Sequence, residues 1–512
     1  MTTNNLFSRK VSVFHDRVAP EEGYLAGYAL LMDILADEGI QTPLPDRLTI
    51  ISEKHHRYAN DEWLVLTPRH RPDNNLKSHL FFALRYEGVD LYILKNIFRH
   101  SGPESISQII RHEPTSQYAR RLWFLYEWLL GPLDLPDLKT GTYVEVLDEK
   151  LQYPGPVRNS TRHRVKNNLP GSSEFCPLIR RTETIEQYIA MKLNERGVEG
   201  IHIMDRDLLR RAAAFLLLKD SKASFAIEGE YPPDIRAHTW GKIIGEAGKH
   251  PLSIKEIERL QNIVIGSKKL KQMGLRTGEG FIGDHDSVTF DPIPEHISAK
   301  ANDLPSLMKG LIDTEGLLRV SAYDPILAAA TIAFGFVFIH PLLDGNGRIH
   351  RYLIHHILAS MKYTRRDMIF PVSAAMLDKL PEYRDALQAY SNPRLELIQW
   401  EGTDDHNVKI TNETIDIYRY YDLTRQAEYL YRCVEETIKH TIPDELDYLH
   451  RYDQVVSEIN EHVSLPNNKI DLLIKMLQQN VGKLSKAKRE KFFDELSDEE
   501  FSTIEEIFSH HF

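Results

Sequence analysis

The sequence predicts a mainly α-helical protein built from more than one domain. The chain has 512 residues, of which 42% are hydrophobic and 27% are charged. This composition is ordinary for a soluble globular protein, and the length is too great for a single hydrophobic core. Apolar residues recur at spacings of three and four over much of the chain, which is typical of helices. Within residues 181–404, the clear strand pattern is confined to 274–297, where glycines, alternating apolar residues and prolines predict a β-hairpin.

Changes in composition along the chain predict three domains, at residues 1–180, 181–404 and 405–512. The first mixes helical patterns with loop-rich segments, and no motif indicates its role. The last has apolar residues at helical spacing with charges between them, which predicts a separate helical region.

The segment 154–173 is rich in Pro, Gly, Ser, Asn and Arg, which predicts a linker or an exposed basic loop at the end of the first domain. Four of its residues could contact phosphates: Arg158, Arg162, Arg164 and Lys166. We favour a solvated loop, because a run of charges without a docking element is usually hydrated.

The charge balance, the cysteines and the lack of long apolar stretches bear on possible partners and on the cellular compartment. The formal net charge of -11 provides no overall attraction to nucleic acid or anionic lipid, although the first domain could still bind nucleic acid through a local basic patch. Cys176 and Cys433 match no metal-binding or disulfide framework, so we expect structural thiols in a reducing compartment. The first residues lack the apolar segment of a signal peptide, and the uncharged stretch 325–339 is shorter than the roughly 20 residues of a membrane helix. We expect a cytoplasmic protein without membrane contacts.

The stretch before the most polar cluster of the chain predicts a buried helix. Asp324 and Pro325 are an N-cap residue followed by proline at the first helical position. The body of this helix, as far as Ile339, is apolar on every side, which predicts the central helix of a helical domain. A second helix is expected after Arg348, with one apolar face at helical spacing made by Ile349, Tyr352, Leu353, Ile357, Ser360 and Met361.

The connection between these helices, HPLLDGNGRIHR at 340–351, has the residues of a phosphate site. Small or αL-tolerant residues let backbone N–H groups converge on an anion at a helix N-terminus, and arginines suit phosphate oxygens. A carboxylate can hold Mg²⁺ against the same phosphates, and a histidine, with a usual pKa of about 6.5, can act as a general base. The small or αL-tolerant residues are Gly345, Asn346 and Gly347, and the arginines are Arg348 and Arg351. The carboxylate is that of Asp344, and the histidine is His340.

Each of these residues alone is compatible with an ordinary connection between helices. Their fixed spacing and complementary roles around one phosphate favour nucleotidyl or phosphoryl transfer. His350 has no role in this scheme, and we expect it on the helix surface.

The cluster resembles the signature of the Fic family, His-x-Phe-x-Asp/Glu-Gly-Asn-Gly-Arg-x-x-Arg, whose typical members are protein adenylyltransferases. The resemblance covers roughly residues 185–400 and implies a Fic-type helical core with a β-hairpin flap. Leu342 stands where the family usually has Phe, a residue that packs into the core, so the change affects packing more than chemistry. Gly347 is retained, whereas relatives of the Doc type, which transfer phosphate, have lysine there. AMP transfer is therefore favoured.

The resemblance also implies roles for the residues of the signature. His340 would deprotonate a hydroxyl of a target protein, which attacks the α-phosphate of ATP and expels pyrophosphate, and Asp344 would hold Mg²⁺. The turn 345–347 and Arg348 would bind the α- and β-phosphates, and Arg351 the γ-phosphate.

A second stretch, SFAIEG at 224–229, resembles the inhibitory pattern of the family, Ser/Thr-x-x-x-Glu-Gly/Asn. The resemblance implies that Glu228 binds Arg351, which could then no longer bind a γ-phosphate, and predicts autoinhibition in cis. The alternative is an ordinary helix end, with Gly229 as the cap and Glu228 on the surface. In some relatives this glutamate supports removal of AMP, which leaves the reverse reaction open.

The hairpin resembles the family's flap, which pairs with an extended segment of the target by β-augmentation. Four flap residues would border the nucleotide: Gly280, Phe281, Ile282 and Gly283. Tyr383 resembles the segment that closes over adenine. Transfer of another nucleotide stays open, as does a different class of function, a nucleotide-sensing protein that binds a partner or DNA. The sequence also leaves a homo-oligomer open.

Overall fold

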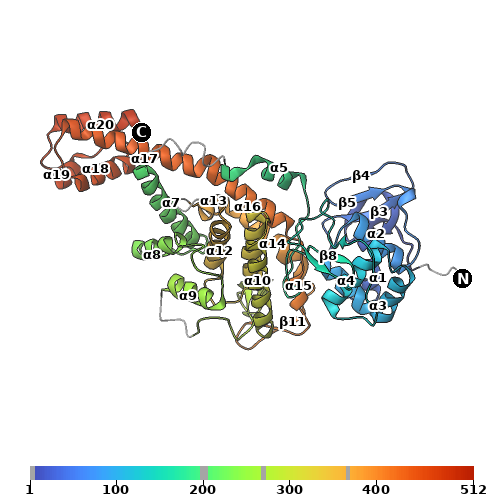
Figure 1. Ribbon diagram of the computed structural model, residues 1–512. Coiled ribbons are helices and arrows are strands. Elements are labelled where there is room, and N and C mark those ends of the chain that lie inside the picture. The colour runs from blue at the N-terminus through green and yellow to red at the C-terminus, as the bar shows by residue number, and fades with distance from the viewer. Residues whose placement is uncertain (1–5, 196–205, 267–271, 365–368) are drawn as a thin grey trace.

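The computed structural model describes residues 6–195, 206–266, 272–364 and 369–512 (Figure 1). Figure 1 shows an elongated molecule, with the N-terminal region and the last helices at opposite ends of a central helical body. The fold is mainly α-helical, with small sheets concentrated in the N-terminal region, as predicted.

The N-terminal region combines a mixed sheet with four helices. The sheet has the strand order β1-β2-β3-β5-β4, in which the pair β3 and β5 is parallel and the other pairs are antiparallel. All five residues of β3 are buried, because this strand is central and covered on both faces. The elements are β1 (Lys10–Phe14), β2 (Arg17–Ala26), α1 (Tyr28–Asp37), β3 (Leu48–Ser52), β4 (Tyr58–Ala59), β5 (Trp63–Leu66), the 3₁₀ turn η1 (Pro68–His70), α2 (Leu76–Tyr86), α3 (Leu91–His112) and α4 (Gln117–Leu130).

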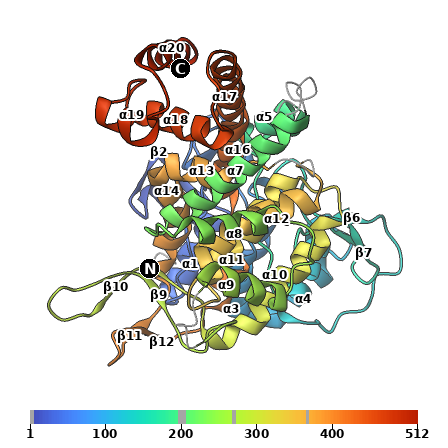
Figure 2. The same ribbon diagram turned by 90° about the vertical axis from the view of Figure 1, so that its left-hand side faces the viewer.

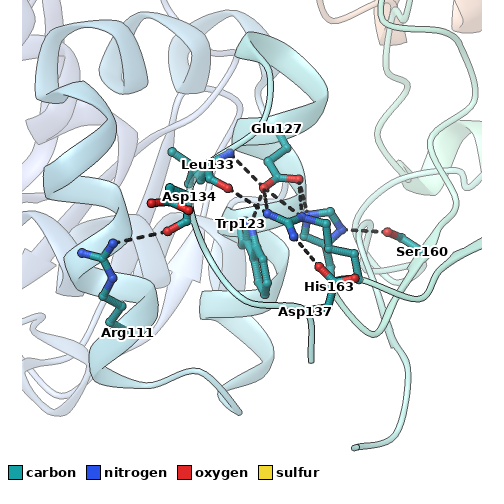
Figure 3. A network of polar contacts seen from close by, with 9 residues as sticks. Arg111, Trp123, Glu127, Leu133, Asp134, Asp137, Ser160 and His163 are labelled. Carbon is teal, nitrogen blue, oxygen red and sulfur yellow. Dashed lines mark hydrogen bonds and ion pairs between the residues drawn. The ribbon is translucent and has the colours of Figure 1, made fainter. Parts of the chain in front are cut away.

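The segment 154–173 is folded, so its prediction as a linker or solvated loop was wrong. It contributes two strands to the small sheet β6 (Val144–Glu145), β8 (Val165–Asn167) and β7 (Arg158–Ser160), which packs on α4. Figure 3 shows Glu127 of α4 facing His163, with a 2.9 Å contact from Nε2 to Oε2, while Ser160 Oγ lies 2.7 Å from His163 Nδ1. Arg162 also pairs with Glu127, at 3.0 Å. The Glu127 carboxylate, which is distant in the sequence, thus neutralises the charge of Arg162, a residue that composition alone predicts to be solvated.

The central region surrounds one apolar helix. Asp324 caps α11, and its Oδ1 accepts hydrogen bonds from the backbone N–H groups of Ile326 (2.8 Å) and Leu327 (3.1 Å). Every residue from Ile326 to Ile339 is buried, because α10, α12 and α16 pack around this helix. The elements are α5 (Glu183–Met191), α7 (Arg206–Ala226), α8 (Asp234–Ile244), α9 (Ile254–Ile265), β9 (Phe281–His285), β10 (Pro292–Ile297), the 3₁₀ turn η2 (Ala301–Asp303), α10 (Leu304–Arg319), α11 (Pro325–Ile339), α12 (Asn346–Ser360), α13 (Val372–Asp378) and α14 (Leu380–Leu395).

The C-terminal residues divide between two cores. The main core continues through α16 to Leu449, so the predicted boundary at 404/405 coincides with no break in packing. A second core runs from Val455 to Phe508 at the far end of α17 (Figures 1 and 2). The elements are β11 (Trp400–Gly402), β12 (Val408–Ile410), α15 (Ile415–Arg419), α16 (Thr424–Glu436), the π-helical segment η3 (Thr437–Thr441), α17 (Ile442–His462), α18 (Asn467–Gln479), α19 (Lys486–Phe492) and α20 (Asp498–His511).

Two further features bear on the class of protein. Cys176 and Cys433 are free and buried. None of the helices in the described ranges combines the length and apolar character that a membrane crossing requires.

Substituting two glycines tests how tightly the central helix is packed. A Cβ on Gly335 of α11 would lie 2.3 Å from Cζ of the buried Phe175, whereas a Cβ on Gly316 of α10 meets no atom within 4 Å. We expect Gly335→Ala to lower the free energy of unfolding by about 1–3 kcal/mol through overpacking. Gly316→Ala should raise it by roughly 0.5–1 kcal/mol, because alanine loses less backbone entropy. Urea unfolding of both variants measures this, and a change of the same sign in both would contradict the packing.

Candidate active site

The polar cluster begins where α11 ends. His340 is the C-cap, with φ of 52°, and its N–H donates to the Phe336 carbonyl at 3.0 Å. The Asn346 side chain closes the turn, because Oδ1 accepts from Leu342 N–H (3.0 Å) and Nδ2 donates to the Leu342 carbonyl (2.8 Å). Leu342 itself is buried in the core, where the family's Phe would pack. The Asn346 side chain therefore shapes the turn, and only its backbone remains for a phosphate.

The second helix begins earlier than predicted, at Asn346, with Gly345 in the left-handed conformation at the N-cap. Gly347 thus lies in the first helical turn, where N–H groups lack helical partners and suit an anion. The prediction of a single buried face for this helix was also incomplete. α12 contacts α11 as well as α7, α8 and α9, so more than one of its faces is covered.

His350 shows the consequence, and its prediction as a surface residue was wrong. Its side chain is fully buried, and Nδ1 lies 2.7 Å from the Ala333 carbonyl of α11. Burial lowers the pKa of His350 to about 3. Periodicity cannot separate a helix buried on several sides from an amphipathic one when the extra faces carry polar residues.

The second arginine of the cluster, Arg351, is 1% exposed and lies against the end of α7. Its Nη2 donates to Glu228 Oε1 and to the Ser224 carbonyl, both at 2.7 Å, and Nε donates to Ser224 Oγ at 3.0 Å. The structure therefore places Glu228 where the resemblance implied. A Cβ on Gly347 would lie 2.1 Å from Glu228 Oε1, so this close approach requires glycine.

The first arginine, Arg348, binds two carboxylates and is 2% exposed. Nη2 donates to Asp344 Oδ1 at 2.8 Å, and Nη1 donates to Glu230 Oε1 at 2.6 Å. Glu230 also binds Arg236 of α8, with 3.0 Å between Oε2 and Nη1. The sequence analysis missed Glu230, and the available hint was an acidic residue immediately after Gly229. Both arginines expected to bind phosphate are thus occupied by carboxylates of residues 228–230.

The electrostatics of the site follow from this pairing. Burial by itself would raise the pKa of the Glu228 carboxyl, but the positive charges of Arg351 and then Arg348 hold it below its usual value. Burial lowers the pKa of His340 to about 3, and the nearby His296 and Arg276 contribute to this shift. At neutral pH the imidazole of His340 is therefore uncharged and can accept a proton.

One cavity of about 280 Å³ joins several of the predicted site residues. It is bordered by Glu228, Ile282, His340, Gly347 and Tyr383. These residues come from the turn after α7, the hairpin, the end of α11, α12 and α14. Residues distant in sequence therefore share one concave space.

The hairpin forms as predicted, but its four predicted residues differ in position. Ile282 borders the cavity, while Gly280, Phe281 and Gly283 do not line it. Gly283 has φ of 150°, and a Cβ there would lie 2.2 Å from the Ile293 carbonyl oxygen, so glycine is required by strand pairing. Tyr383 is buried, and its ring stacks on His350 with 6.1 Å between centroids.

A metal ion would have one carboxylate available at this turn. The Asp344 side chain is 47% exposed and uses Oδ1 for Arg348. Within the described residues, no group of three or more potential metal-ligating side chains occurs. Mg²⁺ at this position would therefore depend on Asp344 together with oxygens of a bound phosphate and water, which is its usual mode in phosphoryl-transfer sites.

Comparison with known proteins finds relatives for the part of the chain that contains this turn. Residues 251–358 match the Fic/DOC family. The matched residues include the polar turn at 340–351. A protein adenylyltransferase, fic-1 of Caenorhabditis briggsae, is 30% identical over 111 residues, which are 21% of this chain and 20% of that protein. The similarity to this curated relative thus spans about one fifth of its length.

Two solved structures are similar to part of the chain. A Fic family protein from Desulfovibrio desulfuricans G20 is 17% identical, with 62% of this chain and 89% of that chain covered and a TM-score of 0.38. A Fic domain containing signaling protein from Bacteroides thetaiotaomicron VPI-5482 is also 17% identical, with 51% and 98% covered and a TM-score of 0.32.

The buried His350 of α12 makes stability depend on pH. Its pKa is about 3 in the folded protein and about 6.5 in an unfolded chain. Between these values the unfolded state binds one more proton, so the free energy of unfolding falls as pH falls, by up to about 1.4 kcal/mol per unit. We expect His350→Asn, which keeps a donor near the Ala333 carbonyl, to reduce this slope by about one proton between pH 6 and 4. Urea unfolding at several pH values measures the slope, and an unchanged slope would contradict a neutral, buried imidazole.

Proposed function

We propose that this protein is an autoinhibited protein adenylyltransferase, which transfers AMP from ATP to a Ser, Thr or Tyr hydroxyl of a target protein or of itself. The observation that carries the proposal is the cavity beside α12, because His340 and Gly347 border it and Glu228, its third wall, binds Arg351. A histidine and a helix N-terminus thus border a space that can receive phosphates, and the carboxylate on its third wall is bound to an arginine of the same helix. The match of residues 251–358, which include His340, Gly347 and Arg351, to the Fic/DOC family supports the assignment.

In the proposed reaction, the target hydroxyl attacks the α-phosphorus of ATP. A new bond joins the hydroxyl oxygen to this phosphorus, the bond from the α-phosphorus to the bridging oxygen breaks, and pyrophosphate leaves. The hydroxyl proton passes to His340, which is uncharged at neutral pH because burial lowers its pKa. Backbone N–H groups at Gly347 and Arg348, with the Arg348 guanidinium, bind the α- and β-phosphates, and Arg351 binds the γ-phosphate.

Inhibition in this proposal is competition for the same N–H donors. Glu228 holds Arg351 at 2.7 Å, and Glu230 holds Arg348 at 2.6 Å, so phosphate oxygens must displace both carboxylates. A difference of only about 2.7 kcal/mol between the inhibited and competent arrangements would suppress activity roughly a hundredfold. The glutamate can inhibit strongly without preventing all nucleotide binding.

Mg²⁺ and the target protein complete the proposal. The half-exposed Asp344 suits a magnesium ion that is also bound by phosphate oxygens, and such an ion would offset phosphate charge. β9 pairs with β10 in a two-stranded sheet, and no third strand covers its other edge within the described residues. An extended segment of the target could pair there by β-augmentation, which places its hydroxyl near the cavity through backbone hydrogen bonds.

Three alternatives share the same site. Glu228 could support removal of AMP from a modified target, the nucleotide could differ from ATP, or the protein could sense a nucleotide without catalysis. A sensor needs no base, so the position of His340 on the cavity wall favours an enzyme.

Intact-mass spectrometry with Mg²⁺ and ATP tests transfer and inhibition together. We expect Glu228→Gly to gain the mass of AMP, because Arg351 becomes available to the γ-phosphate. The wild-type protein should gain much less, and Glu228→Gly combined with His340→Ala none, because the base is missing. If all three remain unmodified in the presence of cell lysate although calorimetry shows that ATP binds, the sensor is the better description.

The second carboxylate has its own expected effect. Glu230→Gln removes the negative charge that lies beside Arg348 but keeps the length of the residue 230 side chain. A hydrogen bond to a charged group contributes about 1.5–3 kcal/mol, so ATP should bind roughly tenfold more tightly or better to Glu230→Gln. Glu246→Gln, in the loop after α8, forms none of the ion pairs around Arg348 and serves as the control. Equal ATP affinity of the two variants by calorimetry would show that Glu230 does not compete with phosphate.

A further inference from the structure

Arg276 joins the catalytic turn to both ends of the hairpin. Its Nε donates to the His340 carbonyl at 2.9 Å, Nη1 donates to the Gly278 carbonyl at 2.6 Å, and Nη2 donates to the Ala299 carbonyl. Its own N–H donates to the Pro341 carbonyl at 3.0 Å. Gly278 precedes β9 and Ala299 follows β10, so a single residue holds the entry of the hairpin, its exit and the turn that carries the proposed base.

Stability alone is a poor explanation for a charge in this place. Arg276 is 6% exposed and pairs with no carboxylate within the described residues. Burial lowers its pKa to about 10, so it remains charged at neutral pH; the negative charge of Glu279 acts on it without an ion pair, and its side-chain hydrogen bonds go to carbonyl oxygens. A buried cation without a directly paired carboxylate is costly, and apolar residues of similar volume often serve a fold better.

The conformation of His340 requires such a restraint. Its φ of 52° is left-handed, which is unfavourable for a residue with a Cβ and persists where the surroundings fix it. The His340 N–H is held by the last turn of α11, through Phe336. The His340 carbonyl is held by Arg276, and the adjacent residues Leu275 and Leu342 pair as an isolated β-bridge. The direction of the His340 imidazole therefore depends on the peptide group that follows it, and Arg276 holds the carbonyl of that group.

We propose that Arg276 is a positioning residue, which fixes the His340 peptide relative to the hairpin so that a target segment docked on β9 presents its hydroxyl to the base. This inference rests on the proposed adenylyl transfer. Arg276 contacts none of the residues assigned to ATP phosphates, namely Gly347, Arg348 and Arg351. Its loss therefore affects the transfer step and leaves ATP binding unchanged.

The test uses the full-length Glu228→Gly protein as the parent and measures AMP transfer to an added protein acceptor. Arg276→Met keeps most of the side-chain volume and removes the donors, and Arg276→Lys keeps the charge. Arg121→Met is the matched control, because Arg121 is also 6% exposed and donates to two backbone carbonyls, those of Val146 (2.8 Å) and Leu84 (3.2 Å), in the N-terminal region.

We expect Arg276→Met to lower kcat by about a hundredfold, the usual effect of a misplacement near 1 Å, while KM for ATP stays within about twofold. Arg276→Lys should fall between parent and Arg276→Met, and Arg121→Met should keep the parental kcat even if it unfolds at lower temperature. Millimolar guanidinium should restore part of kcat in Arg276→Ala and none in His340→Ala. Parental kcat in Arg276→Met, or an equal loss in Arg121→Met, would overturn the proposal.

A second readout separates failure of this inference from failure of the proposed function. Labelled histidine side chains allow His340 to be followed by NMR without any turnover. One sharp set of His340 signals in the parent should become several, or broaden, in Arg276→Met and not in Arg121→Met. If the parent transfers no AMP, the adenylyl-transfer proposal fails, and unchanged His340 signals in Arg276→Met would overturn the positioning role independently.

Discussion

Two buried guanidinium groups at the start of α12 determine how the surrounding structure must be arranged. Arg348 and Arg351 are 2% and 1% exposed, and a permanent charge at this depth is costly unless a negative partner compensates it. In the structure, Glu228 and Glu230 supply that partner from the segment just after α7. In the proposed reaction, phosphates supply it. Under the proposed function, inhibition would follow from charge compensation, because arginines that bind phosphates would also attract carboxylates.

The position of α7 follows from a second buried contact. Asp220 lies on α7 two turns before Glu228, and its carboxylate accepts from Ser373 N–H at 2.7 Å and lies 2.9 Å from Nε2 of His355 on α12. α7 is therefore fixed to α12 and α13 independently of the inhibitory carboxylates. Gly229 has φ of 72°, a conformation that favours glycine, so the chain can turn sharply just after Glu228. Release of the two arginines requires movement of the segment 227–230 that follows α7, and the helix can stay in place.

The sequence predicted best those features that depend on neighbouring residues. The start of α11 follows from Asp324 and Pro325, its burial from an uninterrupted apolar stretch, and the hairpin from glycines and alternation. The partner of Arg351 was inferred through the family resemblance, since periodicity contains no information about contacts between α7 and α12. Where one helix is covered on several sides, as α12 is at His350, the sequence pattern is misleading because polar residues inside a fold look like surface residues.

The residues that sequence reasoning missed have partners far away in the chain. Glu230 reaches Arg348 across 118 residues, and Arg276 reaches the His340 carbonyl across 64. Arg162 belongs to a run of basic residues whose composition predicts a solvated loop, yet in the fold it binds Glu127 of α4. An arginine that binds backbone carbonyls has no sequence signature, since every residue supplies a carbonyl. Only the fold determines which carbonyls are left without a partner and can accept from it.

The same charge compensation bears on the strength of the base. In the structure His340 has a pKa of about 3, which keeps the imidazole neutral but makes it a weak acceptor at neutral pH. In the proposed reaction the oxygens of the α-phosphate would lie next to His340, closer than the carboxylates that the triphosphate displaces, and negative charge near a histidine raises its pKa. His340 should therefore become a stronger base when ATP occupies the site, while the buried cation Arg276 limits how far its pKa can rise. On this argument, replacement of carboxylates by phosphates both opens the site and prepares the base for the proton it must accept.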